Sequence, residues 1–508
     1  MQAQRKYEEF LAEAAVINDL GKAAALLSWD QDTYMPEGGS QGRGHQMATL
    51  DSIRHARLTS ARMADLLSAL EAAELPADGV EAATVREARR AYERATRLPS
   101  RLVEELARQS SSARLAWVRA READDFGLFE PELARMVELK REEADAVGFE
   151  TERYDALLDE YEPGATVAEV RRIFGRLREE QVALLAEIGD SSVKLSDAPL
   201  LLGFPPAEQA AYVASLAAAV GYDFGRGRLD ETIHPFAESM GLNDVRITTR
   251  YDHGNLATAL FGTLHEVGHA LYEQGIDPAF SRTPLAHAAG LGVHESQSRL
   301  WENLVGRSLA FWQGSYPKLQ SAFEPRLRDV PLAAFHQAIN VARPSLVRIE
   351  ADEVSYNLHI LVRFELETAL LDGDLAVKDL PAAWNDRYRD YLGVVPTSDL
   401  QGCLQDIHWS VGLFGYFPTY ALGNLMSVQL FEAAERHVGD LEGAIRAGDF
   451  APLLSWLRKN VHRHGNRYSP AELLERATGA RLDAGPYLDY LRAKFGGLYQ
   501  LSPARTGA

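Results

Sequence analysis

The feature that most constrains this chain is the motif His265-Glu266-Val267-Gly268-His269, which lies inside an apolar stretch from residue 255 to residue 275. Residues four apart lie on one face of a helix, so His265 and His269 can present two imidazoles to one metal ion. Glu266 lies beside them, and its carboxylate would be next to a bound water without being a ligand. The motif therefore predicts a helix that carries a hydrolytic metal site.

The predicted limits of this helix are Asn255, a good N-cap, and Gly275, a good residue to follow a helix. Gly268 lies in its interior, where it costs roughly 1 kcal/mol relative to alanine. A glycine at such a position indicates that another element approaches closely. The expected buried stripe consists of Leu256, Leu260, Leu264, Val267 and Leu271.

A catalytic zinc ion takes three protein ligands and leaves a fourth position for water, so a third ligand is needed. The segment 290–304 reads as a helix after its glycines, and we expect Glu295 to be the ligand. Two residues compete for this role. His294 lies 100° round the helix from Glu295 and fits better behind a ligand than as one. Glu302 lies two turns after Glu295 and could equally be solvated.

Composition limits the class of protein. The 508 residues are 46% hydrophobic and 25% charged, as in an ordinary globular protein. A formal net charge of −20 argues against a nucleic-acid partner. No apolar run approaches the roughly 18 residues that span a bilayer, which predicts a soluble protein. The single Cys403 and an N-terminal segment without a continuous apolar region favour the cytoplasm.

Residues 1 to about 190 read as successive amphipathic helices, interrupted by a predicted loop at 29–44 that contains Pro36, Gly38 and Gly39. The proline-rich segment 194–209 is the clearest boundary in the chain. We predict three subdomains of one unit: an N-terminal helical region at 1–195, a catalytic region at 196–430 and C-terminal helices at 431–508.

The best strand candidate precedes the metal helix, where Val245, Ile247, Thr249 and Tyr251 alternate with polar residues. The edge of such a strand could pair with an extended peptide and hold it over the metal. A purely structural two-stranded ribbon is an equally good interpretation.

Several short motifs follow one another along the chain: WDQxTxMP at 29–36, HPF at 234–236, HExxH at 265–269, HES with a following glutamine at 294–297 and GxxQDxHW at 402–409. A DxRxT pattern is formed by Asp244, Arg246 and Thr248. With these motifs the chain resembles the M32 family of metallocarboxypeptidases, whose IRxxAD pattern appears at 347–352 with Val347 in place of isoleucine.

This resemblance implies a mainly helical fold like that of neurolysin and angiotensin-converting enzyme, with a deep central cleft and a small β-ribbon next to the HExxH helix. It also implies a homodimer that removes single residues from the C-termini of peptides with broad specificity. One divalent metal per chain is expected, with zinc favoured and cobalt possible.

Amide hydrolysis needs an activated water, a stabilised oxyanion and a proton for the leaving amine. Glu266 is the expected base, which takes a proton from the metal-bound water and passes it to the amine. The segment 405–423 offers His408, Tyr416 and Tyr420 at expected loop positions, as in neurolysin-like enzymes. We favour His408 and Tyr420 as oxyanion donors, and Tyr416 as a substrate contact; packed aromatic residues are the alternative.

An exopeptidase must also bind a free α-carboxylate, for which a bidentate arginine is best suited. Arg348, early in a helix expected from about residue 345 to 371, resembles the family's carboxylate-binding arginine; its alternative is a helical ion pair with Asp352. Arg246 is the reserve candidate. The resemblance also implies that the segments that contain His234 and Arg246 close one end of the cleft, which would explain single-residue removal.

Two other functions remain open. An endo-oligopeptidase or dipeptidyl carboxypeptidase could use the same scaffold, and a non-catalytic helical peptide-binding module could keep such a site as a remnant.

Overall fold

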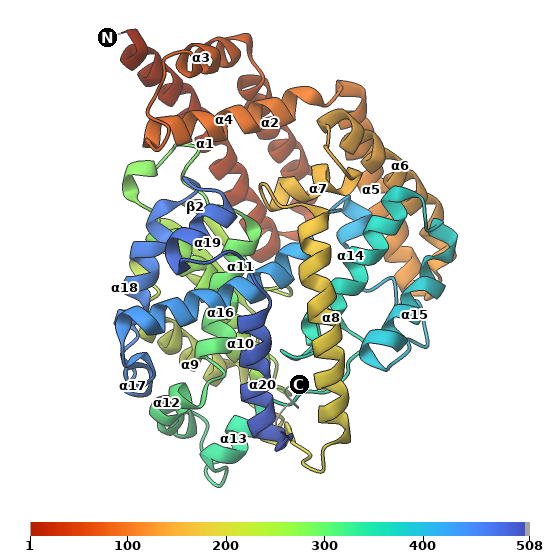
Figure 1. Ribbon diagram of the computed structural model, residues 1–508, viewed down its shortest axis with the longest axis vertical. Coiled ribbons are helices and arrows are strands. Elements are labelled where there is room, and N and C mark those ends of the chain that lie inside the picture. Colours follow the sequence, from red (N-terminus) through yellow and green to blue (C-terminus); the bar gives the residue numbers. More distant parts are fainter. Residues whose placement is uncertain (1, 503–508) are drawn as a thin grey trace, which may run out of the picture. The chain divides into compact units, whose positions relative to one another are not determined.

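The computed structural model describes residues 2–502, which form two compact units, each composed of three separate stretches of chain. Within the described residues, the first unit combines 2–96, 197–339 and 429–481, and the second combines 97–196, 340–428 and 482–502. One division between the units, at 196/197, falls in the proline-rich segment, and another, at 428/429, falls inside a helix. The three-subdomain division therefore stays a prediction. Both units are mainly helical, as expected (Figure 1).

The first unit contains the three strands and most of the helices. Its N-terminal helices are α1 (Gln2–Thr33), α2 (Ser40–Leu58), α3 (Ala61–Glu71) and α4 (Val80–Arg97). Its central elements are α9 (Pro206–Ala219), β1 (Leu229–Glu231), β2 (Ala237–Gly241), β3 (Asp244–Thr249), α10 (Leu256–Gly275), α11 (Leu291–Arg299), α12 (Leu309–Ala322) and α13 (Leu332–Ala338). Its last helices are α17 (Leu441–Arg446), α18 (Ala451–Asn460) and α19 (Pro470–Thr478).

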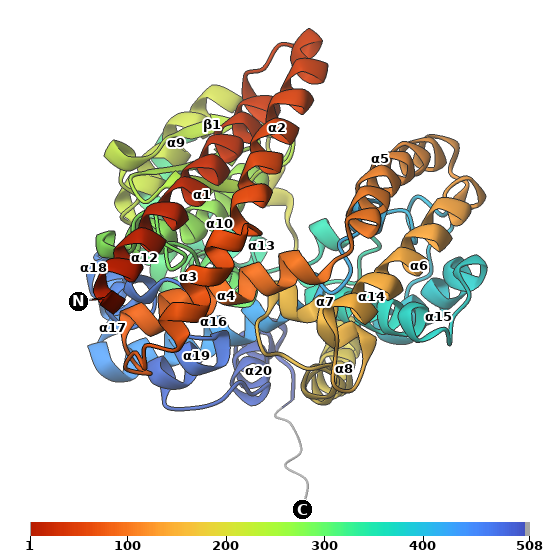
Figure 2. The ribbon, with the colours of Figure 1, turned by 90° about the horizontal axis from the view of Figure 1, so that it is seen from above.

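The second unit is built of helices alone among the described residues. They are α5 (Ser100–Ala123), α6 (Glu130–Val147), α7 (Arg153–Tyr161), α8 (Val167–Asp190), α14 (Tyr356–Asp372), α15 (Leu380–Leu392) and α20 (Gly485–Tyr499). Helix α16 (Pro418–Val438) crosses the division between the units. Figure 2 shows α5 beside α6, and within the first unit α1 beside α2.

The predicted loop at 29–44 is shorter than expected. Helix α1 continues to Thr33 and α2 begins at Ser40, so the chain turns within a few residues around Pro36. The prediction was wrong at both ends. At the first end, Trp29 is buried and packed: the guanidinium of Arg246 lies 4.3 Å from the centre of its ring. Tertiary packing thus extends the helix where local turn residues suggested an end.

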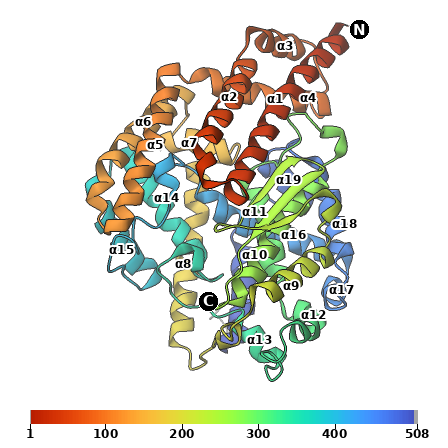
Figure 3. The same cartoon turned by 180° about the vertical axis from the view of Figure 1, so that it is seen from behind.

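The predicted strand is β3, the middle strand of a three-stranded sheet in the order β1-β3-β2. Strand β1 runs parallel to β3, and β2 runs antiparallel to it. The sheet packs against α10 and α1 (Figure 3), and Lys22 on α1 donates to the carbonyl of Ser239 on β2 at 2.7 Å. Since both edges of β3 are paired, it cannot bind an extended peptide, and the two-stranded alternative is also wrong.

Candidate active site

Helix α10 begins where the sequence predicts. The side chain of Asn255 accepts a hydrogen bond from the backbone of Ala257 at 3.0 Å and caps the first turn. All five residues of the predicted stripe are fully buried, which leaves His265 and His269 on a neighbouring face. Gly275 is the last residue of the helix rather than the residue after it; a Cβ there would lie 2.6 Å from the Cβ of His462. Its role is therefore close packing.

Helix α11 lies against α10 at Gly268, as the interior glycine predicted. A Cβ at Gly268 would lie 2.5 Å from the carbonyl oxygen of Gln297 and 2.5 Å from the Cα of Ser298. Both atoms belong to the backbone, so they cannot move aside cheaply. Only glycine lets α11 approach closely enough to bring Glu295 beside the two imidazoles.

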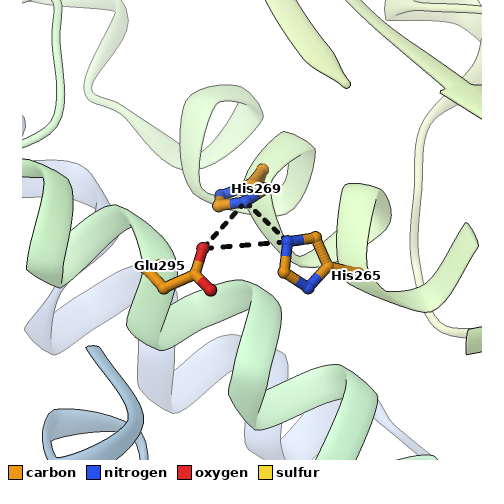
Figure 4. A group of neighbouring side chains, drawn as sticks. All are labelled: His265, His269 and Glu295. Carbon is orange, nitrogen blue, oxygen red and sulfur yellow. Dashed lines mark hydrogen bonds and ion pairs between the residues drawn. The ribbon is translucent and has the colours of Figure 1, made fainter. Parts of the chain in front are cut away.

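The side chains of His265, His269 and Glu295 converge on one point (Figure 4). The Nε2 atoms of the two histidines are 3.2 Å apart. Oε2 of Glu295 lies 3.7 Å from Nε2 of His265 and 3.5 Å from Nε2 of His269. In a tetrahedral zinc site with bonds of about 2.0–2.1 Å, ligand atoms are about 3.3–3.4 Å apart. The three donors therefore fit a tetrahedral cation and leave one position open.

The charges around these donors also suit a cation. Burial lowers the pKa of His269 to about 3, so this imidazole is neutral at neutral pH, as a metal ligand must be. Burial alone would raise the pKa of Glu295, but Arg299 and the two imidazoles outweigh it and hold the pKa below its usual range. Burial would lower the pKa of His265, yet Glu295 and Glu302 raise it, which shows that this point attracts positive charge.

Glu266 is buried beside the group. Burial raises the pKa of its carboxyl to about 7, against the opposing effect of His265. A carboxyl group with a pKa near the working pH can both accept and return a proton. This is the property that a general base and acid in amide hydrolysis needs.

Glu302 and His294 lie behind the imidazoles. Oε2 of Glu302 is 2.9 Å from Nδ1 of His265, and Glu302 is buried, so a solvated position for it is wrong. The ring of His294 stacks on that of His269 at 4.3 Å, and its Nε2 lies 3.2 Å from Oε1 of Glu273. Both residues contact imidazoles of the group, whereas the third donor atom of the group belongs to Glu295.

The second unit holds a different buried cluster, in which Arg348 and Arg363 share one carboxylate. Nη2 and Nε of Arg348 donate to Oδ1 of Asp406 at 2.8 and 3.0 Å, and Nε of Arg363 donates to Oδ2 at 2.6 Å. Although burial opposes both shifts, the pKa of Asp406 is held below its usual range by the two guanidinium groups, and Asp406 raises the pKa of Arg348.

The helix expected to carry Arg348 begins only at Tyr356, although it ends before Gly373 as predicted. Arg348 lies in a short 3₁₀ turn, Arg348–Glu350. The carboxylate of Asp352 accepts hydrogen bonds from the backbone of Val354 and Ser355 instead, at 2.9 and 3.2 Å. The local ion pair between Arg348 and Asp352 is therefore wrong, because Asp352 shapes the turn before the helix.

His408 and Tyr420 lie close to this cluster. Nε2 of His408 is 3.4 Å from the hydroxyl of Tyr420, whose ring lies 5.1 Å from the guanidinium of Arg348. Burial lowers the pKa of His408 to about 4, so its ring is neutral at neutral pH. Tyr416 packs edge-on against Tyr420 at 5.4 Å. Tyr420 is in the first turn of α16 and not in a loop as predicted.

Arg246 and His234 differ in their surroundings. The guanidinium of Arg246 binds both oxygens of Asp244 at 2.8 Å, so its fork already has a carboxylate. His234 is exposed. Three hydrogen bonds between Thr248 and the backbone of Phe236 join the segment that contains His234 to the one that contains Arg246.

A family model described as carboxypeptidase Taq (M32) metallopeptidase matches residues 9–495 of this chain. The chain belongs to the M32 family. It is 47% identical to thermostable carboxypeptidase 1 of Thermus thermophilus over 502 aligned residues. This alignment covers 97% of this chain and 98% of the relative. The chain is 39% identical to carboxypeptidase 1 of Bacillus subtilis over 496 aligned residues. This second alignment covers 97% of this chain and 99% of the relative.

The fold agrees with solved M32 structures. The structure of the M32 carboxypeptidase from Deinococcus radiodurans superposes with a TM-score of 0.95 at 42% identity, over 98% of this chain and all of the other. The protein is thus a metallocarboxypeptidase, and a non-catalytic binding module is excluded. An M32 metallopeptidase requires a divalent metal, and His265, His269 and Glu295 form the group that could hold it.

The sequence did not point to Arg299, Asp406 or Arg363 as parts of these clusters. A signal existed for Arg299, which lies one helical turn after Glu295 and is spaced to pair with it. No local pattern marks the pairing of Arg348 with Asp406, because the two residues are 58 positions apart.

Among residues 2–502, no helix is long and apolar enough to cross a membrane.

Proposed function

We propose that this M32 enzyme releases single amino acids from the C-termini of peptides with broad specificity, with zinc held by His265, His269 and Glu295. The observation that carries the proposal is the buried arginine pair around Asp406, which has one more positive than negative charge. A free α-carboxylate would balance it.

A divalent cation bound by the three donors would polarise water and the scissile carbonyl. Glu266 accepts a proton from the attacking water and returns it to the leaving amine. Its buried position and a pKa near 7 support both steps. Since neutral imidazole keeps one N–H, His408 can donate to the developing oxyanion together with the hydroxyl of Tyr420.

Arg348 is proposed to bind the substrate carboxylate. Its Nη1 donates to the hydroxyl of Tyr356 at 3.2 Å and its Nη2 to Asp406, which leaves one N–H on each nitrogen without a partner among residues 2–502. Two N–H groups on the outer edge of one guanidinium match the two oxygens of a carboxylate. Asp406 and the ring of Tyr420 hold the guanidinium in place.

Arg246, His234 and Tyr416 are proposed as further substrate contacts. For Arg246 the proposal is weaker, because Asp244 already occupies its fork. We also propose a homodimer in the cytoplasm. The single cysteine, Cys403, is buried and unpaired, which supports a reducing compartment.

The test is a mass-spectrometric time course on an unblocked peptide, with and without a chelator. The proposal expects fragments shortened from the C-terminus by one residue at a time, and no cleavage after removal of the metal. Loss of two residues at a time would indicate a dipeptidyl carboxypeptidase, and internal fragments an endo-oligopeptidase; either result would overturn the proposal.

A further inference from the structure

Arg299 binds two acidic residues of the metal group at once. Its Nε donates to Oε1 of Glu295 at 2.7 Å, and its Nη1 donates to Oε2 of Glu302 at 3.0 Å. The side chain of Arg299 is largely buried, with 14% of its surface exposed. Arg299 and Glu295 are one turn apart on α11, so the helix itself fixes their contact.

The contact with Arg299 decides which oxygen of Glu295 is available. Oε2 points toward Nε2 of both imidazoles, whereas Oε1 is held by the guanidinium. The hydroxyl of Ser298 also reaches Oε2, at 3.2 Å, but it lies nearer to the backbone carbonyl of Glu295, at 2.7 Å. A cation at the group would therefore receive a single oxygen from Glu295, unless the charge-assisted bond to Arg299 were broken.

The contact with Glu302 acts on an imidazole. Oε2 of Glu302 accepts from Nδ1 of His265 at 2.9 Å, which turns Nε2 toward the group. Glu302 belongs to a π-helical turn, Leu300–Val305, in which the backbone N–H of Gly306 donates to the carbonyl of Trp301 at 2.9 Å. Such turns are frequent at functional sites. Arg299, just before this turn, ties Glu302 to Glu295.

We propose that Arg299 is a positioning residue for the metal: it restricts Glu295 to one-oxygen binding and couples that ligand to the carboxylate that orients His265. This inference rests on the proposed metal site. It also explains the charge balance there, since Glu266, Glu295 and Glu302 are opposed by Arg299 and by Arg307, whose Nη2 lies 3.4 Å from Oε1 of Glu302. Loss of Arg299 would free Glu295 to bind through both oxygens.

The experiment compares the wild-type enzyme with Arg299→Gln and Arg299→Lys. Zinc affinity is measured by competition with a chromophoric chelator, and ligand geometry by the visible absorption of the cobalt-substituted protein. We expect Arg299→Gln to weaken zinc binding about 10- to 100-fold and to change the cobalt spectrum. Arg299→Lys should recover part of the affinity but not the spectrum, because one ammonium group cannot hold both carboxylates.

The matched control is Arg307→Gln, which removes the same charge next to Glu302 without touching Glu295 and should leave the cobalt spectrum unchanged. Wild-type affinity and spectrum in Arg299→Gln would overturn the proposal. If that variant does not fold, a wild-type spectrum in Arg299→Lys would overturn it equally. Absence of zinc binding in the wild-type enzyme would instead contradict the proposed metal site itself, so the two failures are distinguishable.

Discussion

The buried charges around His265 in the first unit and those around Arg348 in the second are organised alike but have opposite signs. Three carboxylates and two guanidinium groups surround the imidazoles, whereas two guanidinium groups share one carboxylate at Asp406. Each cluster thus has one unbalanced charge when Glu266 is ionised. A buried charge is costly unless it is paired, so we propose that each cluster binds a ligand of the opposite sign, a cation in the first unit and an anion in the second.

Another buried acid, Glu367 in the second unit, shows a different way to satisfy such a group. Glu367 accepts hydrogen bonds from the hydroxyl of Tyr154 at 2.6 Å, the indole of Trp409 at 2.7 Å and the backbone of Gly415 at 3.1 Å. These donors are uncharged, and burial raises the pKa of Glu367 to about 7. A proton therefore does for Glu367 what guanidinium groups do for Asp406.

The largest effect is expected for Glu266→Gln. The variant should retain about one metal ion per chain, because Glu266 is not among the three donors, while turnover falls by roughly 10²- to 10⁴-fold with loss of the general base. Elemental analysis and peptide hydrolysis measure the two quantities. Loss of the metal together with turnover would contradict the assignment of Glu266 as the base. Glu266 could then no longer be distinguished from the metal ligands of the first unit.

The next effect is expected for Arg348→Lys, which keeps the charge but removes the fork. Truncating a partner of a buried charge pair costs about 2–5 kcal/mol, so kcat/KM on free-acid peptides should fall at least about 30-fold, with unchanged metal content. Arg246→Lys is the matched control and should have a smaller effect, since Asp244 already holds its fork. The reverse ranking would make Arg246 the residue that binds the carboxylate.

Glu367→Gln tests the acid whose three hydrogen-bond donors are uncharged. Because the pKa of Glu367 is raised in the folded protein, more protons are bound in the folded than in the unfolded state, and its contribution to stability is lost as pH rises from about 4.5 to about 7. The rise of this pKa from 4.5 to about 7 on folding corresponds to about 3 kcal/mol in the free energy of unfolding. Relative to Glu367→Gln, the wild-type protein should therefore lose stability over this range in urea unfolding followed by circular dichroism. If the difference in stability between the wild-type protein and Glu367→Gln stays constant between pH 4.5 and 8, the raised pKa of Glu367 is contradicted.

Gly268→Ala should give the smallest effect, a destabilisation of about 1–3 kcal/mol from the contact with the backbone of α11, and weaker metal binding as Glu295 shifts. Gly262→Ala in the same helix is the matched control. Its Cβ would meet only Oγ1 of Thr249 at 4.0 Å, so it should be neutral or stabilise by up to roughly 1 kcal/mol. Thermal unfolding and zinc affinity of both variants provide the comparison, and equal behaviour would contradict the close-approach argument.

The sequence predicted best what depends on neighbouring residues. The start of α10, its buried stripe and the closeness of another element at Gly268 follow from an N-cap, a helical period and a glycine. The convergence of Glu295 with His265 and His269 was expected from motif spacing. These features are local or depend on a single helix contact.

The errors concern residues whose partners are distant in the chain. Helical periodicity placed Arg348 in a helix, but Asp352 bonds to the following backbone and Arg348 pairs with Asp406 far along the chain. Strand β3 looked like an edge because β1, only three residues long, carries no clear alternating pattern of its own. Turn residues likewise suggested a loop where Trp29 is held by tertiary packing.

We propose that the excess positive charge of the buried arginine pair in the second unit is balanced by the C-terminal carboxylate of the substrate. The most direct measurement compares the wild-type enzyme on one peptide as the free acid and as its C-terminal amide. We predict that kcat/KM for the amide is lower by about 10²-fold or more, because the excess positive charge of Arg348 and Arg363 would stay unpaired. Equal kcat/KM values for the two peptides would contradict the account.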